Sequence, residues 1–232
     1  MTIAPPRLWH PTACQAAPPH PPRLPALVGR QGIFTADGER AGYELLYRAH
    51  LHDTSRVDLW PADAQDRATE HVIAAAFWRS PDITVPHPAF VNVTRGFLMS
   101  GAALSHCDPA TVVLEVLETV EVDDALLAQV RALRERGFRI AVDDFTGTDS
   151  QVALLPLADY VKIDVRDLGA DGGAALVALA RSGRGGRERL LVAERVERAT
   201  ELERCRDLGF DLYQGFWFER VAIHVQGGYA AS

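Results

Sequence analysis

The sequence has few cysteines and no two of them at a metal-binding spacing. Cys14, Cys107 and Cys205 are odd in number, far apart and without a C-x-x-C pair. This pattern argues against a disulfide framework and against a cysteine-rich zinc site. We therefore expect a reducing, cytoplasmic location.

Long apolar runs and an excess of positive charge are also absent. The longest apolar run, VIAAAFW at residues 72–78, is far shorter than the roughly 18 residues that cross a bilayer. No lysine-led start followed by an apolar segment marks a secretory signal. The 24 Lys and Arg against 31 Asp and Glu give a formal net charge of −7. We therefore expect neither a membrane nor duplex nucleic acid as a partner, and a phosphate-bearing ligand would need local positive charge.

The composition favours one globular domain after a short irregular segment. A 232-residue chain with 47% hydrophobic residues can bury a sizeable core. Residues 1–25 hold 8 of the 14 prolines, and proline lacks the backbone donor that helices and sheets need. The sequence predicts a flexible Pro-rich segment at residues 1–25 and a single domain at residues 26–228.

From residue 26 onward, short β-branched runs alternate with longer segments whose apolar residues recur every three or four positions, which is typical of β/α units around a parallel sheet. The predicted strands lie at residues 26–34, 41–48, 89–94, 111–118, 138–145, 159–165, 189–196 and 210–216. The predicted helices lie at residues 62–80, 122–137, 172–183 and 199–209. Eight strands are the number of a closed (β/α)8 barrel of the TIM type.

Polar residues fall within or just after these predicted strands, one or two per strand. They are Glu44, Asn92, Glu115, Asp143, Asp144, Lys162, Glu194 and Gln214. A barrel gathers the carboxyl ends of its strands at one face, where its chemistry is found. Taken singly, each residue is equally typical of a solvated strand position or a turn. Glu115 and Asp143, however, interrupt apolar runs, and an unpaired buried carboxylate is costly, so the sequence predicts a cation beside them.

The chemistry of this set favours hard divalent ions. Carboxylate and carboxamide oxygens suit Mg²⁺ or Mn²⁺ and not zinc. The adjacent Asp143 and Asp144 can bridge two ions about 3.5–4 Å apart, an arrangement common in phosphodiester hydrolysis. Lys162 lies inside a predicted strand, where its ammonium is expected to meet carboxylates or a phosphoryl oxygen. A lysine whose stem lies along the barrel and reaches solvent is the alternative.

Seven short motifs occur in an order that resembles one known family. They are YELLYR, VNVT, LEVLE, VDDF, VKID, AERVE and QGF. Over about residues 28–225 the chain resembles the EAL-domain cyclic di-GMP phosphodiesterases. The resemblance implies a β/α barrel with one antiparallel strand near its start. It also implies hydrolysis of cyclic di-GMP to linear pGpG at a two-metal site with Mg²⁺ or Mn²⁺, with Ca²⁺ as an inhibitory ion. The motifs are most similar to those of the subgroup that is often fused to an HDOD domain. We expect no HDOD domain in this chain, because its length leaves no room for one.

The resemblance also implies roles for individual residues. Glu44, Asn92, Glu115 and Asp143 resemble the ligands of one metal ion, and Asp144 is shared or holds the second. Glu194 resembles the catalytic residue beside the metal-bound water, as a metal ligand or as the general base. Lys162 resembles the lysine that positions this water. Gln31, Arg48 and Gln214 resemble residues that bind the nucleotide, and Glu118 and Glu197 resemble anchors behind the metal ligands.

The chain departs from the family pattern at several positions. FTGTDSQ follows the paired Asp143 and Asp144 where F-G-x-G-Y-S is usual, in a loop that the family uses for metal retention and dimer contacts. Gly32 replaces a proline, Arg195 replaces a glycine, and E-L-L replaces E-A-L. The alternative hypothesis is therefore a catalytically degenerate barrel that acts as a cyclic di-GMP receptor or a protein-interaction module. An enolase-like barrel with Lys162 as base is a third interpretation, which would need a separate capping domain. A homodimer is an expectation from the family alone.

Overall fold

The computed structural model describes residues 27–50, 57, 60–74, 83–101, 103–169, 173–182, 189–225 and 228–229. The predicted Pro-rich segment at residues 1–25 lies outside these residues, as do residues 75–80 of the predicted helix at 62–80.

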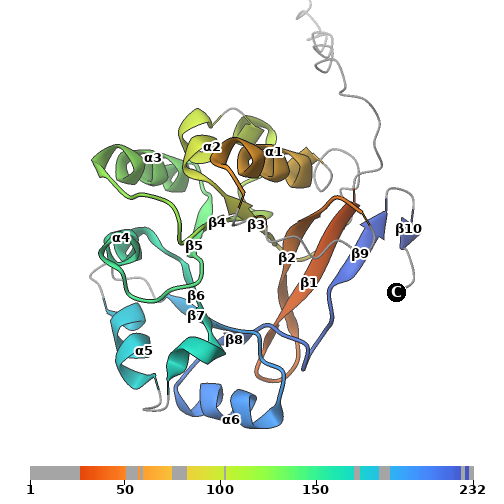
Figure 1. Ribbon diagram of the computed structural model, residues 1–232, viewed down its shortest axis with the longest axis vertical. Coiled ribbons are helices and arrows are strands. Elements are labelled where there is room, and N and C mark those ends of the chain that lie inside the picture. The colour runs from red at the N-terminus through yellow and green to blue at the C-terminus, as the bar shows by residue number, and fades with distance from the viewer. Residues whose placement is uncertain are drawn as a thin grey trace, which may run out of the picture.

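Eight strands close into a barrel, and helices lie around it except on the side of Leu27–Thr35 and Ala222–Val225 (Figure 1). The eight strands are β1 (Leu27–Thr35), β2 (Arg40–Arg48), β3 (Ala89–Val93), β4 (Val112–Val116), β5 (Arg139–Val142), β6 (Tyr160–Asp164), β7 (Leu190–Glu194) and β8 (Leu212–Tyr213). Strands β2 to β8 pair in parallel, and β1 is antiparallel to both β2 and β8. The predicted barrel, its eight strands and its antiparallel strand near the start are therefore confirmed. Two further strands, β9 (Ala222–Val225) and β10 (Gly228–Tyr229), extend the sheet beside β1 and were not expected from the sequence.

The helices lie outside the barrel (Figure 1). They are α1 (Ala62–Ile73), α2 (Arg95–Ser100), α3 (Asp124–Glu135), α4 (Asp149–Leu154), α5 (Ala174–Arg181) and α6 (Ala199–Asp207), with the 3-10 turns η3 (Ala103–His106), η4 (Leu155–Leu157) and η5 (Val165–Leu168). The four predicted helices correspond to α1, α3, α5 and α6. The six-residue α2 and α4 are too short to show a helical period, and each begins at a threonine cap, Thr94 or Thr148. Within the described part of the chain no helix is long and apolar enough to span a membrane.

Alternation along the strands sorts the side chains into an outer and an inner set. Val112, Leu114 and Val116 of β4 belong to the large cluster between barrel and helices. Val113 belongs to a smaller, separate apolar cluster, made of Ile33, Phe90, Val113, Ala141, Tyr160, Val192 and Leu212.

Two residues further along the same strands the inner side chains become polar. Six of the seven apolar residues of the smaller cluster, those other than Ile33, are followed at this spacing by Asn92, Glu115, Asp143, Lys162, Glu194 and Gln214. The smaller apolar cluster therefore fills the barrel interior on the side of the amino ends of the parallel strands. A polar layer lies next to it, at their carboxyl ends.

The barrel closes along a short seam. Strand β8 pairs with β1 only at Phe34 and Thr35, and β9 pairs with the other end of β1, at Leu27–Arg30. Residues 214–221 connect β8 to β9 and pass beside the middle of β1.

An ion pair of 2.6 Å between Arg40 and Glu219 holds this connection to the hairpin of β1 and β2. A Cβ atom at Gly32 would lie 2.2 Å from Arg40 Nη1 and 2.4 Å from Glu219 Oε2. Glycine at position 32 thus leaves room for the ion pair, which gives this departure from the family pattern a structural reason.

Candidate active site

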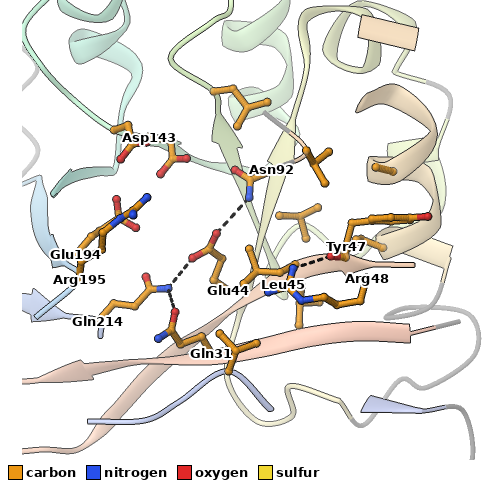
Figure 2. Close-up of a pocket in the computed structure, with 18 of the residues that line it drawn as sticks. Gln31, Glu44, Leu45, Tyr47, Arg48, Asn92, Asp143, Glu194, Arg195 and Gln214 are labelled. Atoms are coloured by element: carbon orange, nitrogen blue, oxygen red, sulfur yellow. Dashed lines mark hydrogen bonds between the residues drawn. The ribbon is translucent and has the colours of Figure 1, made fainter. Parts of the chain in front are cut away.

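A cavity of about 470 Å³ opens at the carboxyl ends of the strands, within the size range of small-molecule sites. Figure 2 shows its polar residues converging from β1, β2, β3, β5, β7 and β8. The predicted site residues among its lining are Gln31, Glu44, Arg48, Asn92, Glu118, Asp143, Asp144, Glu194, Glu197 and Gln214. The other two, Glu115 and Lys162, are 0% and 1% exposed and belong to the same layer of the barrel interior. The fold therefore brings all twelve candidates to one end of the barrel.

Lys162 stands at the centre of this layer and is the sole lysine of the sequence. Its Nζ lies 2.8 Å from Glu115 Oε1, 2.8 Å from Glu194 Oε1, 3.0 Å from Asp143 Oδ1 and 3.4 Å from Glu44 Oε2. The alternative that this lysine reaches solvent is therefore wrong. Four carboxyl groups therefore crowd around one ammonium in the barrel interior.

The acid–base properties of the layer reflect burial and this crowding of charge. Burial raises the pKa of Glu115 well above its usual range, and Glu44 and Asp143 add to the effect while Lys162 opposes it. Burial likewise raises the pKa of Glu194 to about 8 against the attraction of Lys162. Burial lowers the pKa of Lys162, but the surrounding carboxylates outweigh it and raise that pKa well above its usual range. Extra positive charge would keep these carboxyl groups ionised.

Glu44 differs from its neighbours because amide groups support its charge. Asn92 Nδ2 donates to Glu44 Oε1 at 3.2 Å, and Gln214 Nε2 donates to Oε2 at 2.5 Å. Burial raises the pKa of Glu44, but Lys162 and these hydrogen bonds outweigh it, and the pKa is lowered. Gln31 continues the chain of contacts, since its Oε1 accepts from Gln214 Nε2 at 3.1 Å and its Nε2 donates to the Glu219 carbonyl at 3.2 Å. Figure 2 shows this row from Gln31 to Asn92.

Several oxygens in the layer have no donor and suit a metal ion. Asn92 Oδ1, Glu115 Oε2 and Gln214 Oε1 are buried and accept no hydrogen bond. Carboxylate oxygens of Glu118, Asp143 and Asp144 all lie within 4.8 Å of one another. These donors are hard oxygens, which fit Mg²⁺ or Mn²⁺. Glu118 thus lies among the candidate ligand atoms themselves, and not only behind them as the resemblance implies.

The second of the paired aspartates has an unusual backbone. Asp144 has φ 40°, a left-handed conformation that directs it away from the course of β5. Burial raises the pKa of Asp144 to about 6, helped by the charges of Asp143 and Glu118. The backbone therefore turns at Asp144, while carboxylate oxygens of Asp143 and Asp144 stay within 4.8 Å of each other.

Gln151, in the unusual FTGTDSQ loop, holds this turn and is a residue that the sequence analysis missed. Its Oε1 accepts from the backbone N–H groups of Thr146, Gly147 and Thr148 at 2.9, 3.1 and 3.3 Å. Its Nε2 donates to the carbonyls of Asp143 at 3.3 Å and Asp144 at 2.9 Å. The sequence signal that could have found it is the capping box formed by Thr148 and Gln151.

Asp164, at the end of β6, is a second residue without an expected role. It is 4% exposed and accepts hydrogen bonds from Arg166, from N at 2.9 Å and from Nε at 3.0 Å. Burial raises the pKa of Asp164, but Arg166 and Arg195 outweigh it, and the pKa is lowered. Asp164 therefore ties the loops after β6 and β7 together beside the cavity.

Arg48 and Glu197 lie further from the acidic layer. Arg48 lines the cavity, and its Nη1 donates to the Tyr47 carbonyl at 2.7 Å. Glu197 also lines the cavity, and its backbone N–H donates to Glu201 at the start of α6. Neither side chain is one of the four that lie at ion-pair distance from Lys162.

The chain matches proteins of known family. The family model of the EAL domain matches residues 31–221. The cyclic di-GMP phosphodiesterase CdgJ of Vibrio cholerae is 34% identical over 204 residues, which cover 86% of this chain and 45% of that protein. The uncharacterized protein YuxH of Bacillus subtilis is 28% identical, covering 84% and 47%. The chain thus spans about half the length of these curated relatives.

Solved structures agree in fold. The manganese and cyclic di-GMP complex of Klebsiella pneumoniae BlrP1 has a TM-score of 0.66 at 26% identity, covering 91% of this chain and 59% of that one. The calcium and cyclic di-GMP complex of the same protein has a TM-score of 0.67 at 25% identity, covering 92% and 59%. With its barrel, its inward-facing acids and a family match over most of its length, the chain belongs to the EAL domain family.

Proposed function

We propose that this chain hydrolyses cyclic di-GMP to linear pGpG with two divalent ions, Mg²⁺ or Mn²⁺. The observation that carries the proposal is the convergence of Glu44, Glu115, Asp143 and Glu194 on Lys162, beside buried oxygens that lack donors. The similarity to a cyclic di-GMP phosphodiesterase and to a manganese and cyclic di-GMP complex supports it.

The side chains divide into two candidate metal sites. Glu44, Asn92, Glu115 and Asp143 would hold one ion, and Asp144 with Glu118 would hold the second. When bound, the ions would supply Lewis acidity at the phosphodiester and at the attacking water. The acid-rich layer needs this positive charge, since one ammonium faces four carboxylates.

The chain's own groups would orient the water and move its proton. Glu194 accepts a proton from the attacking water, and Lys162, 2.8 Å from Glu194 Oε1, holds that carboxylate in place. The water oxygen bonds to phosphorus, the bond from phosphorus to the 3′ oxygen breaks, and that oxygen takes up a proton from solvent, to which Glu194 returns its own. Gln214 and Gln31, hydrogen-bonded to each other, would position the nucleotide from the β1 side.

The test is product formation with purified protein. Incubation with cyclic di-GMP and Mn²⁺ or Mg²⁺ should yield pGpG by chromatography. Glu194→Gln should lower the rate at least about a hundredfold, as expected for loss of a general base, and Glu44→Ala should also abolish metal-dependent turnover. Thr111→Ser, a change at the far end of β4, is the control that should leave the rate unchanged. Intact binding of the nucleotide with no pGpG at micromolar enzyme would refute the proposal.

A receptor that binds without turnover is the second candidate. The observation that favours it is Arg195, a bulky cation next to Glu194 in the lining of the cavity, at a position where the family pattern has glycine. The order that Gln151 brings to the FTGTDSQ loop argues for the enzyme. Calorimetry with the nucleotide in Ca²⁺, followed by the Mn²⁺ assay, separates binding from turnover. A homodimer, the HDOD-associated subgroup and a cytoplasmic location stay predictions.

A further inference from the structure

Arg195 follows Glu194 at the rim of the cavity and has an unusual backbone. Its φ is 57°, in the left-handed region that costs a side-chain-bearing residue free energy relative to glycine. Within the described residues, Asp144 is the other non-glycine residue with positive φ, and it lies in the same site. Strain of this kind gathers at functional positions and indicates that the side chain compensates for it.

The contacts of Arg195 leave most of its guanidinium available. Its Nε lies 2.9 Å from Asp164 Oδ2, and its side chain is 47% exposed. Its terminal nitrogens have no acceptor among the residues that the structure describes. With Nε in an ion pair, the terminal nitrogens of this cavity-lining residue remain available as donors.

Asp164 does not need Arg195 for charge compensation. Arg166 already binds this carboxylate through its backbone N–H, its Nε and its Nη2. Arg166 is 65% exposed in its side chain and is not among the residues that line the cavity. The two arginines therefore share one carboxylate, but only Arg195 faces the site.

The cavity has acids at its centre and an arginine on either side of them. Figure 2 shows Arg195 beside Glu194 on one side of Glu44 and Arg48 on the other. The lining acids Glu44, Asp143, Asp144 and Glu194 repel an anionic ligand until cations offset them. A guanidinium matches the oxygens of a phosphate in geometry and charge.

We propose that Arg195 is a substrate-binding residue that contacts a phosphate of the cyclic dinucleotide and sets its affinity. The inference rests on the proposed ligand of the site. It assigns to Arg195 a role in binding and not in the proton transfer that Glu194 performs, so its loss should raise KM and leave kcat nearly unchanged.

The experiment measures the Kd for cyclic di-GMP by calorimetry in Ca²⁺, with wild type, Arg195→Gly, Arg195→Lys and Arg166→Ala. Arg195→Gly should weaken binding about tenfold, as expected for a partly exposed charged contact. Arg195→Lys should recover part of this loss, and Arg166→Ala should stay within about twofold of wild type. Glycine suits a φ of 57°, so Arg195→Gly should remain folded, which its melting temperature checks.

Salt gives a second measurement that a structural role would not change. Added NaCl should weaken binding to wild type more than binding to Arg195→Gly, because screening acts on the charge that the variant lacks. Equal Kd values for wild type and Arg195→Gly, or an equal loss in Arg166→Ala, would overturn the inference.

The outcomes separate this inference from the proposed function. Binding in Ca²⁺ that depends on Arg195, together with no pGpG in Mn²⁺, would sustain the inference and refute the proposed enzyme. Turnover in Mn²⁺ with a KM indifferent to Arg195→Gly would sustain the enzyme and refute the inference. Absence of any binding to wild type would overturn the inference together with its ligand.

Discussion

Gln151→Leu should destabilise the protein and weaken its hold on divalent ions. Gln151 is 3% exposed and makes five hydrogen bonds to the backbone of its own loop, two of them to the carbonyls of Asp143 and Asp144. Leucine fills a similar volume but leaves these buried groups without partners. At about 1 kcal/mol for each good hydrogen bond, and less for the longer ones, the free energy of unfolding should fall by about 3 kcal/mol. Because Gln151 orients two candidate ligands through their backbone, Mn²⁺ affinity should fall about 10- to 100-fold.

Urea denaturation with and without Mn²⁺, and calorimetry with Mn²⁺ alone, measure the two effects. Gln129→Leu is the matched control, because Gln129 on α3 donates a single hydrogen bond to the Leu98 carbonyl at 2.9 Å, outside the cavity. Gln129→Leu should lower the free energy of unfolding by about 1 kcal/mol and leave the Mn²⁺ affinity unchanged. The reasoning would be refuted if Gln151→Leu kept the affinity of wild type and lost no more stability than Gln129→Leu.

Three further changes test other parts of the structure. Lys162→Met should remove turnover and lower the stability of the metal-free protein by about 3–5 kcal/mol, because buried carboxylates lose their cation; denaturation in EDTA measures this, and an unchanged midpoint would contradict it. Gly215→Ala should be more damaging than Gly38→Ala in the same experiment, since a Cβ at Gly215 meets Val196 O at 2.2 Å while one at Gly38 meets nothing within 4 Å; equal losses would count against the close approach. Burial raises the pKa of Cys107 and Cys205 to about 11. A Cys14→Ser protein treated with Ellman's reagent at pH 8 should therefore release no thionitrobenzoate until it is denatured, and rapid release from the native protein would disprove this.

The order of elements and most of the site followed from the sequence because local chemistry decides them. Strands β3 to β8 each show their inner face as an apolar residue followed two positions later by a polar one, as in Val113 and Glu115 or Val192 and Glu194. A charged residue in an apolar run can be recognised from the sequence as a candidate site residue. Barrel topology alone then brings such residues together.

What the sequence did not predict depends on the path of the chain in space. Gln151 reaches carbonyls seven and eight positions earlier, a contact that depends on the turn at Asp144. Asp164 is shared by Arg166 and Arg195, which are 29 positions apart in the sequence and belong to two different loops. The pairing of β9 with β1 likewise requires the bend at residues 214–221, for which a short β-branched run gives no signal.

The short pairing between β1 and β8 has a consequence for motion. Two residue pairs join these strands, whereas β4 joins β3 through five, and regions with fewer backbone hydrogen bonds open locally at lower free energy. Gln31 and Gln214 lie on opposite sides of this junction and are hydrogen-bonded to each other. Amide protons of residues 214–221 should therefore exchange with deuterium sooner than those of β4. A dinucleotide held by both glutamines would slow that exchange, because it would bridge the barrel wall at one of its shortest strand pairings.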